Sequence, residues 1–130
     1  TVLSRLLTND VPDQASNAER LSLRTADGNL RLVTNTMALP VLVWVLESYY
    51  RLSRPQVVER VMAVAFMDGL VMPESDIVAD ALFAYTDSNV DFVDAYNASW
   101  MKSHDLDRVA TFDVKHYSRI EGLRMHPWTD

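Results

Sequence analysis

The sequence predicts an α/β fold in which a central, mostly parallel sheet is flanked by helices, giving three layers. Helical and strand patterns alternate along the whole chain, which is typical of parallel sheets covered by helices. The 130 residues are 48% hydrophobic and 23% charged, the composition of an ordinary globular domain. The sequence contains no internal repeat and no low-complexity linker. We therefore expect a single domain over residues 1–130.

The first clear helix is expected over residues 13–25. Asn9 or Asp10 is a candidate cap for this helix, and a proline stands in its first turn. Gly28 follows the helix, where a residue that adopts positive φ is needed to end it. Residues 30–34 then predict a strand, because β-branched and apolar residues cluster there.

Residues 39–46 form a run of eight apolar residues that includes a proline. Periodicity cannot distinguish a buried strand from a buried helix in such a run. The pattern continues to Arg51, and an element of about twelve residues favours a helix over a strand. We therefore predict a helix here, with Trp44 in the core.

The next helix is expected over residues 54–67. Ser53 precedes it and Gln56 follows three residues later, which is the pattern of a capping box. A short strand is predicted over residues 70–72, after the Asp-Gly pair that ends the helix.

Two further helices and two further strands complete the predicted fold. Ser75 is expected to cap one helix, and the other starts near Asp91; both carry apolar residues at helical spacing. Residues 108–112 predict a strand, and residues 123–125 predict a possible final one.

The charge and the cysteine content limit the possible functions. A net charge of −6 argues against nucleic-acid binding through bulk charge, but it allows a nuclease that holds phosphate through cations. The absence of cysteine excludes disulfides and thiolate metal sites, and it agrees with a cytoplasmic location. No apolar run reaches the length of a membrane span, and no signal peptide is visible. The chain starts at Thr1 without a methionine, so we expect a further segment upstream.

Two acidic clusters near the C-terminus are the strongest candidates for a functional site. Asp91 and Asp94 are three residues apart in a predicted helix and share one face, and Asp113 directly follows the predicted strand 108–112. Ligands collect at the carboxyl ends of parallel strands. If the helix starts beside that edge, the carboxylates converge and repel one another unless a cation neutralises them. Mg²⁺ or Mn²⁺ is the natural occupant, and such a metal activates water against a phosphodiester.

Each of these aspartates also has a purely structural explanation. Asp91 is a candidate helix N-cap, and Asp94 in the first turn complements the helix dipole. Asp113 is a candidate cap for the segment 114–120. Taken one at a time, the aspartates are explained more simply by capping than by metal binding.

Other residue types give weaker indications of chemistry. The three histidines, at positions 104, 116 and 126, have no shared helical spacing, so we do not expect a histidine metal site. No serine lies in a nucleophile-elbow context, and three glycines cannot form a phosphate-binding loop.

Several segments, taken together, resemble VapC-type PIN-domain toxins. These segments are Thr1–Asp10 with Pro12 and Gln14, residues 43–46 followed by 52–54, residues 91–95, Thr111–Phe112–Asp113, and residues 119–124. They occur in the order and spacing of that family and cover essentially the whole chain.

The resemblance implies a PIN-like fold, a metal-dependent endoribonuclease activity and the toxin role in a type II toxin–antitoxin system. It implies Mg²⁺ or Mn²⁺ as cofactor, with Asp94 and Asp113 as metal ligands, Asp91 as a further acidic member, and Thr111 as a neighbour in the pocket. The partners it implies are an RNA substrate, a cognate VapB-like antitoxin and a second copy of the chain.

The sequence departs from the family pattern at two positions. The family's first aspartate would precede Thr1, on an N-terminal strand that is missing here, and its glutamate falls on Val41. Glu47 does not replace that glutamate, because six helical residues rotate it by about 240°. The alternative is therefore a catalytically impaired PIN-fold protein that only binds a partner or RNA. A flavodoxin-like or receiver-like module is a more distant alternative.

Overall fold

A computed structural model describes residues 2–7 and 12–128 of the chain, with Leu6 described in its backbone only. The candidate helix caps Asn9 and Asp10 lie outside the described residues. The chain divides into two compact units, Thr1–Ser75 and Asp76–Asp130, and each is described by itself.

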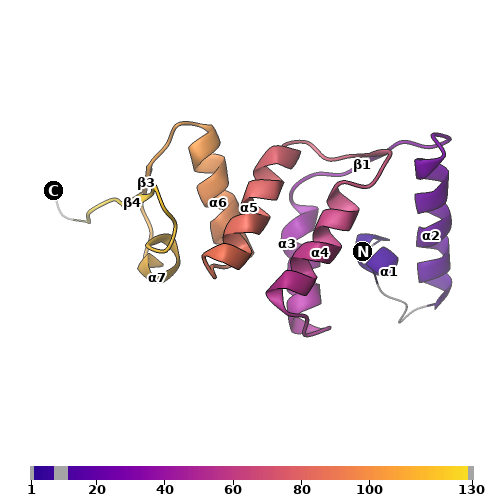
Figure 1. Cartoon of the computed structure of the whole chain (residues 1–130), viewed down its shortest axis with the longest axis horizontal. Coiled ribbons are helices and arrows are strands. Elements are labelled where there is room, and N and C mark those ends of the chain that lie inside the picture. The colour runs from indigo at the N-terminus through magenta and orange to yellow at the C-terminus, as the bar shows by residue number, and fades with distance from the viewer. Residues whose placement is uncertain (1, 8–11, 129–130) are drawn as a thin grey trace. The chain divides into compact units, whose positions relative to one another are not determined.

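The described residues of the first unit form four helices and one pair of strands. Helix α1 packs against α2, and α3 packs against α4 (Figure 1). Strands β1 and β2 pair in parallel, with Leu32 opposite Leu70 and Val33 opposite Val71. In chain order the elements are α1 (Val2–Leu7), α2 (Pro12–Ala26), β1 (Leu32–Val33), α3 (Ala38–Ser48), α4 (Arg54–Ala65) and β2 (Leu70–Val71).

Local sequence signals explain where α3 and α4 begin. The predicted capping box is confirmed: Gln56 N donates to Ser53 Oγ at 3.4 Å, and Ser53 N donates to Gln56 Oε1 at 2.9 Å. The apolar run 39–46 is helical as predicted, and its Pro40 is tolerated in the first turn, where no intrahelical N–H bond is lost. The core of this unit is built mainly from these two helices: Leu39, Leu42, Val43, Leu46, Val57, Val61, Val64 and Ala65.

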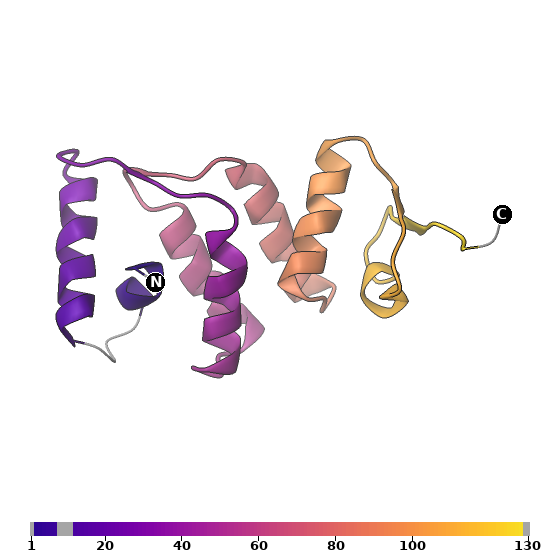
Figure 2. The same ribbon diagram turned by 180° about the vertical axis from the view of Figure 1, so that it is seen from behind.

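The second unit contains two longer helices followed by short elements. Helices α5 and α6 lie side by side in both views (Figures 1 and 2), and the rings of Tyr85 and Phe92 meet edge to face, with centroids 6.4 Å apart. Strands β3 and β4 pair in parallel. The elements are α5 (Ser75–Asp87, beginning at the boundary residue), α6 (Phe92–Ser103), β3 (Arg108–Val109), α7 (Val114–Tyr117) and β4 (Arg124–Met125).

The predicted PIN-like fold with a central parallel sheet is wrong. Within the described residues the strands form only two separate pairs, and every strand is two residues long. Each of the predicted strands 30–34, 70–72, 108–112 and 123–125 contains one two-residue strand, so three of the five residues are irregular in 30–34 and in 108–112, and one of the three in 70–72 and in 123–125. The physical reason is burial. The fully buried apolar residues lie almost entirely on helices, whereas the strand residues are half-buried or exposed, and a central strand must be covered on both faces.

The prediction of a core position for Trp44 is also wrong, because its side chain is 66% exposed. Helix α3 buries Leu42, Val43 and Leu46, and Trp44 lies on the opposite side of the helix. None of the described helices has the length and apolar content that crossing a membrane requires.

Candidate metal centre

Three carboxylates of the second unit converge on one ring nitrogen of His116. His116 Nδ1 lies 2.9 Å from Asp94 Oδ2, 3.2 Å from Asp113 Oδ2 and 3.5 Å from Asp91 Oδ2. The side chains of His116 and Asp94 are largely buried, at 19% and 18% exposure, whereas Asp91 and Asp113 face solvent. At 2.9 Å the nitrogen carries a hydrogen and donates it to Asp94.

Helix α6 places two of these carboxylates. Asp91 occupies the N-cap position with extended backbone angles, yet its side chain makes no capping hydrogen bond. Asp94 lies in the first turn, where a negative charge is stabilised by the helix dipole. Because residues three apart share a helix face, both side chains point toward His116. The cap explanation therefore accounts for the position of Asp91 but not for the orientation of its carboxylate.

The third carboxylate has two roles at once. Asp113 Oδ1 accepts a hydrogen bond from His116 N at 3.2 Å and caps helix α7, as the structural explanation predicted. Its other oxygen, Oδ2, faces the imidazole. Thr111 Oγ1 accepts a hydrogen bond from Asp113 N at 2.9 Å, so it fixes the backbone that carries the carboxylate.

Two contacts hold α7 and the residues after it in place. Asn97 Nδ2 on α6 donates to Tyr117 Oη at 3.2 Å. Arg119 Nη1 donates to the carbonyl oxygen of Asn89 at 2.7 Å, which ties the end of α7 to the loop before α6. These contacts fix the distance between His116 and the start of α6.

Tyr117 lies next to the cluster, and the negative charge of the cluster contributes to raising the pKa of its phenol. Its side chain is almost completely buried. Burial raises the pKa of the Tyr117 phenol, and the charges of Asp94 and Asp113 and a hydrogen bond to Asp94 raise it further, while the bond from Asn97 acts in the opposite direction. The phenol therefore stays protonated under Asp94.

The donor atoms suit a divalent cation. Asp91, Asp94 and His116 each offer one ligand atom, and these atoms all lie within 4.8 Å of one another. With a protonated imidazole, the three carboxylates around it still leave a net negative charge, which attracts a cation. Carboxylate oxygens suit both Mg²⁺ and Mn²⁺, and an imidazole nitrogen favours the softer Mn²⁺. While Nδ1 keeps the hydrogen that it donates to Asp94, His116 is a partner of the carboxylates and not a metal ligand, so a cation would compete with it for them.

The sequence identified the three carboxylates but discounted the residue at their centre. Asp91, Asp94 and Asp113 are brought together as the spacing suggested, and their role as metal ligands stays a prediction. The three histidines share no spacing, so the sequence predicts no histidine at the site, and the position of His116 among the carboxylates corrects that expectation. The useful signal was its position three residues after Asp113, which returns the ring to that carboxylate on a helical turn. The position of the family's glutamate, Val41, lies on α3 in the first unit.

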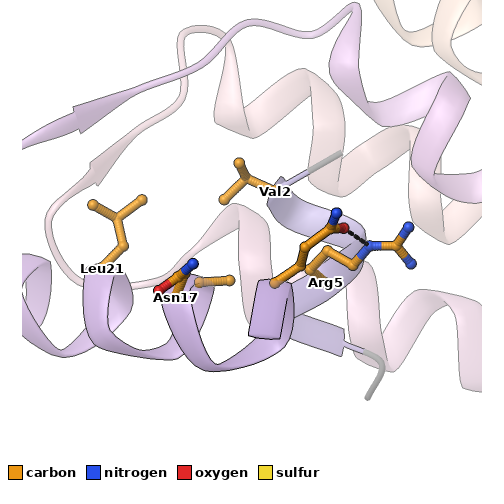
Figure 3. A pocket seen from close by; sticks show the side chains of 6 residues that line it. Val2, Arg5, Asn17 and Leu21 are labelled. Carbon is orange, nitrogen blue, oxygen red and sulfur yellow. Dashed lines mark hydrogen bonds between the residues drawn. The ribbon is translucent and has the colours of Figure 1, made fainter. Parts of the chain in front are cut away.

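Two pockets lie among the described residues of the first unit. One, of about 390 Å³, lies between α1 and α2 and has mainly apolar walls (Figure 3). There Arg5 Nε donates to Gln14 Oε1 at 2.7 Å. The other, of about 470 Å³, includes Trp44, Tyr49 and Tyr50 in its lining. Among the residues that the structure describes, neither lining includes a carboxylate or a histidine.

Comparison of the chain with family models, with curated proteins and with solved structures gives no match.

Proposed function

We propose that this chain is a divalent-metal-dependent endoribonuclease of the toxin type, with Asp94, Asp91 and Asp113 as the acidic residues of its site. The observation that carries the proposal is the convergence of three carboxylates on His116 Nδ1. The resemblance of several segments to VapC-type toxins supports the choice of RNA as substrate. The proposal depends on this site and these segments and does not require the PIN fold.

The residues of the cluster would have different roles in metal binding and catalysis. A bound Mn²⁺ or Mg²⁺ supplies a Lewis acid for the phosphoryl oxygen and lowers the pKa of a water molecule. Asp94, the most buried carboxylate, would hold the cation together with Asp91, and Asp113 would orient water from its exposed side. In the hydrolysis, a water oxygen bonds to phosphorus, the bond from phosphorus to the leaving oxygen breaks, and the water proton passes through a carboxylate to that leaving oxygen.

The test compares Asp94→Asn with Asp80→Asn, an exposed aspartate on α5 outside the cluster. We expect Asp94→Asn to weaken Mn²⁺ binding in calorimetry by at least about tenfold and to reduce cleavage of single-stranded RNA in parallel, as loss of a buried ligand should. Asp80→Asn should match the wild type. If Asp94→Asn retained both metal affinity and cleavage, the assignment would fail.

The second candidate function is binding without catalysis. It is favoured by Val41, which stands where the family's glutamate is expected, and by His116, whose Nδ1 lies 2.9 Å from Asp94 Oδ2 and gives this carboxylate a partner without a metal. A binding protein would retain RNA or partner affinity in chelator and would show no cleavage with either metal. Measuring cleavage and RNA binding by the wild type and by Asp94→Asn, with Mn²⁺ and in chelator, separates the two functions, because cleavage that requires both the metal and Asp94 excludes a protein that only binds.

The toxin role also implies a homodimer and a VapB-like antitoxin. Helix α3 and the residues that flank it offer an apolar surface for a partner, with exposed side chains at Met37, Val41, Trp44 and Tyr49. Clusters of exposed apolar side chains commonly mark protein interfaces. Sedimentation of the wild type and of Trp44→Ser over a range of concentrations tests this surface, since a dimer formed through it should dissociate in the variant.

A further inference from the structure

Phe112 and Trp128 form a stacked pair of aromatic rings on the surface of the second unit. Their ring centroids are 4.6 Å apart and the ring planes differ by 11°. The side chains are nevertheless 88% and 61% exposed. Two parallel rings that remain open to water present a flat π surface, and such surfaces bind other flat π systems.

The strand register positions this stack. In the β3–β4 pair, Arg108 lies opposite Arg124 and Val109 opposite Met125, so each residue pairs with the one 16 positions later (124 − 108 = 16). Phe112 and Trp128 have the same separation (128 − 112 = 16). The two rings therefore keep the register of the strand pair, although the pairing itself ends at Val109 and Met125 and the stack lies three residues beyond the strands.

The backbone holds the two segments together up to the stack. His126 N donates to Val109 O at 2.7 Å, and Arg124 N donates to Asp107 O at 2.8 Å. These two main-chain bonds hold the segments side by side shortly before the rings, so part of the ordering that a ligand would need is already present.

Charged residues of both signs lie near Phe112 in the chain. Asp113, a member of the acidic cluster, directly follows Phe112 in the chain. Arg108 and Lys115 lie within four residues of Phe112, and both are exposed, so their positive charges are available to phosphate. An aromatic surface with cations beside it is the usual way to hold single-stranded nucleic acid on a protein, and it works without a high overall positive charge.

We propose that Phe112 and Trp128 form a stacking platform for an unpaired base of a single-stranded RNA, which sets a neighbouring phosphodiester beside Asp113. This inference rests on the proposed ribonuclease function and names its substrate class as single-stranded RNA. A base in a duplex is already stacked on both faces and cannot use the platform.

Binding of a labelled single-stranded RNA to the full chain, measured by anisotropy in chelator, tests the platform without cleavage. We expect Phe112→Ala and Trp128→Ala each to weaken binding by about tenfold, while Phe112→Tyr and Trp128→Phe stay within about twofold because they keep a π face. Phe83→Ala is the matched control, since Phe83 is an exposed phenylalanine on α5. Binding of the same sequence as a duplex should not respond to any of these changes.

A second measurement removes the base instead of the side chain. Replacing single nucleotides by abasic ones should weaken wild-type binding at one position of the RNA and should have no effect at that position in Phe112→Ala. Because Phe112 is 88% exposed, its replacement leaves the fold intact, so this variant decides the question even if Trp128→Ala unfolds.

The outcomes separate this inference from the proposed function. Three results would contradict the platform. Phe112→Ala could bind RNA as tightly as the wild type, Phe83→Ala could lose as much affinity as Phe112→Ala, or the wild type could fail to bind single-stranded RNA. If Asp94→Asn keeps full cleavage but Phe112→Ala loses RNA affinity, the metal centre is contradicted and the platform is supported. If Asp94→Asn loses cleavage but Phe112→Ala binds RNA as tightly as the wild type, the platform alone is contradicted.

Discussion

His116 is the residue on which the acidic cluster depends. Its Nδ1 atom lies 2.9 to 3.5 Å from three carboxylate oxygens, so without a metal the imidazole is a hydrogen-bond partner within reach of all three. A cation bound by the same carboxylates would take over this role. His116 and a metal ion are therefore alternative ways of offsetting the same negative charge.

Replacing His116 by glutamine tests this exchange. In chelator we expect His116→Gln to lower the free energy of unfolding by about 1.5 kcal/mol, because Asp94 is largely buried and loses a charge-assisted hydrogen bond. Addition of Mn²⁺ should restore more stability to the variant than to the wild type. Urea denaturation with and without Mn²⁺ gives both values, and equal stabilisation of the two proteins would contradict the exchange.

Tyr117 makes stability sensitive to alkaline pH. The folded protein raises the pKa of this phenol above its ordinary value of 10.0. Below that value both the folded and the unfolded phenol are protonated, and the full stability is present. Above it the unfolded phenol ionises first, so the free energy of unfolding falls as the pH rises toward the folded pKa, by at most about 1.4 kcal/mol per pH unit.

The measurement is the difference in unfolding free energy between wild type and Tyr117→Phe from about pH 9 to pH 11. We expect the wild type to lose stability faster than the variant above pH 10. Tyr49→Phe, which alters an exposed tyrosine, serves as the control and should follow the wild type. Parallel curves for Tyr117→Phe and wild type would rule out the effect.

At the scale of the elements, short contacts position parts that are distant in sequence. Gly69, just before β2, adopts φ +83, and a Cβ atom there would lie 2.5 Å from both Cγ2 and O of Thr25 at the end of α2. Leu32 N donates to Gly69 O at 3.1 Å, so the same residue also starts the β1–β2 pair. Close packing at Gly69 thus connects α2 to the strand pair.

Gly69→Ala and Gly28→Ala form a matched pair for testing this connection. Both glycines have positive φ, but nothing lies within 4 Å of a Cβ added at Gly28. We expect Gly28→Ala to cost about 1 kcal/mol from backbone strain alone, and Gly69→Ala to cost about 3 kcal/mol or more because of the added clash. Thermal denaturation of the two variants measures the difference. Similar losses in both would show that Thr25 can move away.

At the scale of the whole molecule, stability comes from helices. The buried apolar side chains belong mainly to α3, α4, α5 and α6, whereas the two strand pairs are too short to be stable alone. Each unit has its own set of buried residues, and each contains one parallel strand pair.

Hydrogen exchange tests this distribution. We expect the slowest amides to lie in α3 and α5, and the amides of Leu32–Val33 and Arg108–Val109 to exchange through local openings well before global unfolding. Exchange measured by NMR or mass spectrometry resolves these segments. Strand amides that were the slowest in the chain would show that the strands belong to a larger sheet and would contradict the helical architecture.

The sequence by itself determined the features that depend on near neighbours. The capping box at Ser53, the helix over the apolar run 39–46 and the shared face of Asp91 and Asp94 all follow from spacing along the chain, because helical geometry is local. The positive φ of Gly28 follows from its place after a helix in the same way.

Tertiary structure decided the features that depend on distant partners. Alternating helices and strands suggested one central sheet, but strand pairing depends on which segments meet, and here they form two isolated pairs. The exposure of Trp44 depends on which face of α3 is covered. His116 enters the acidic cluster only because Asn97 and Arg119 hold α7 and the residues after it against α6 and its preceding loop. Such long-range contacts leave no periodic trace in the sequence.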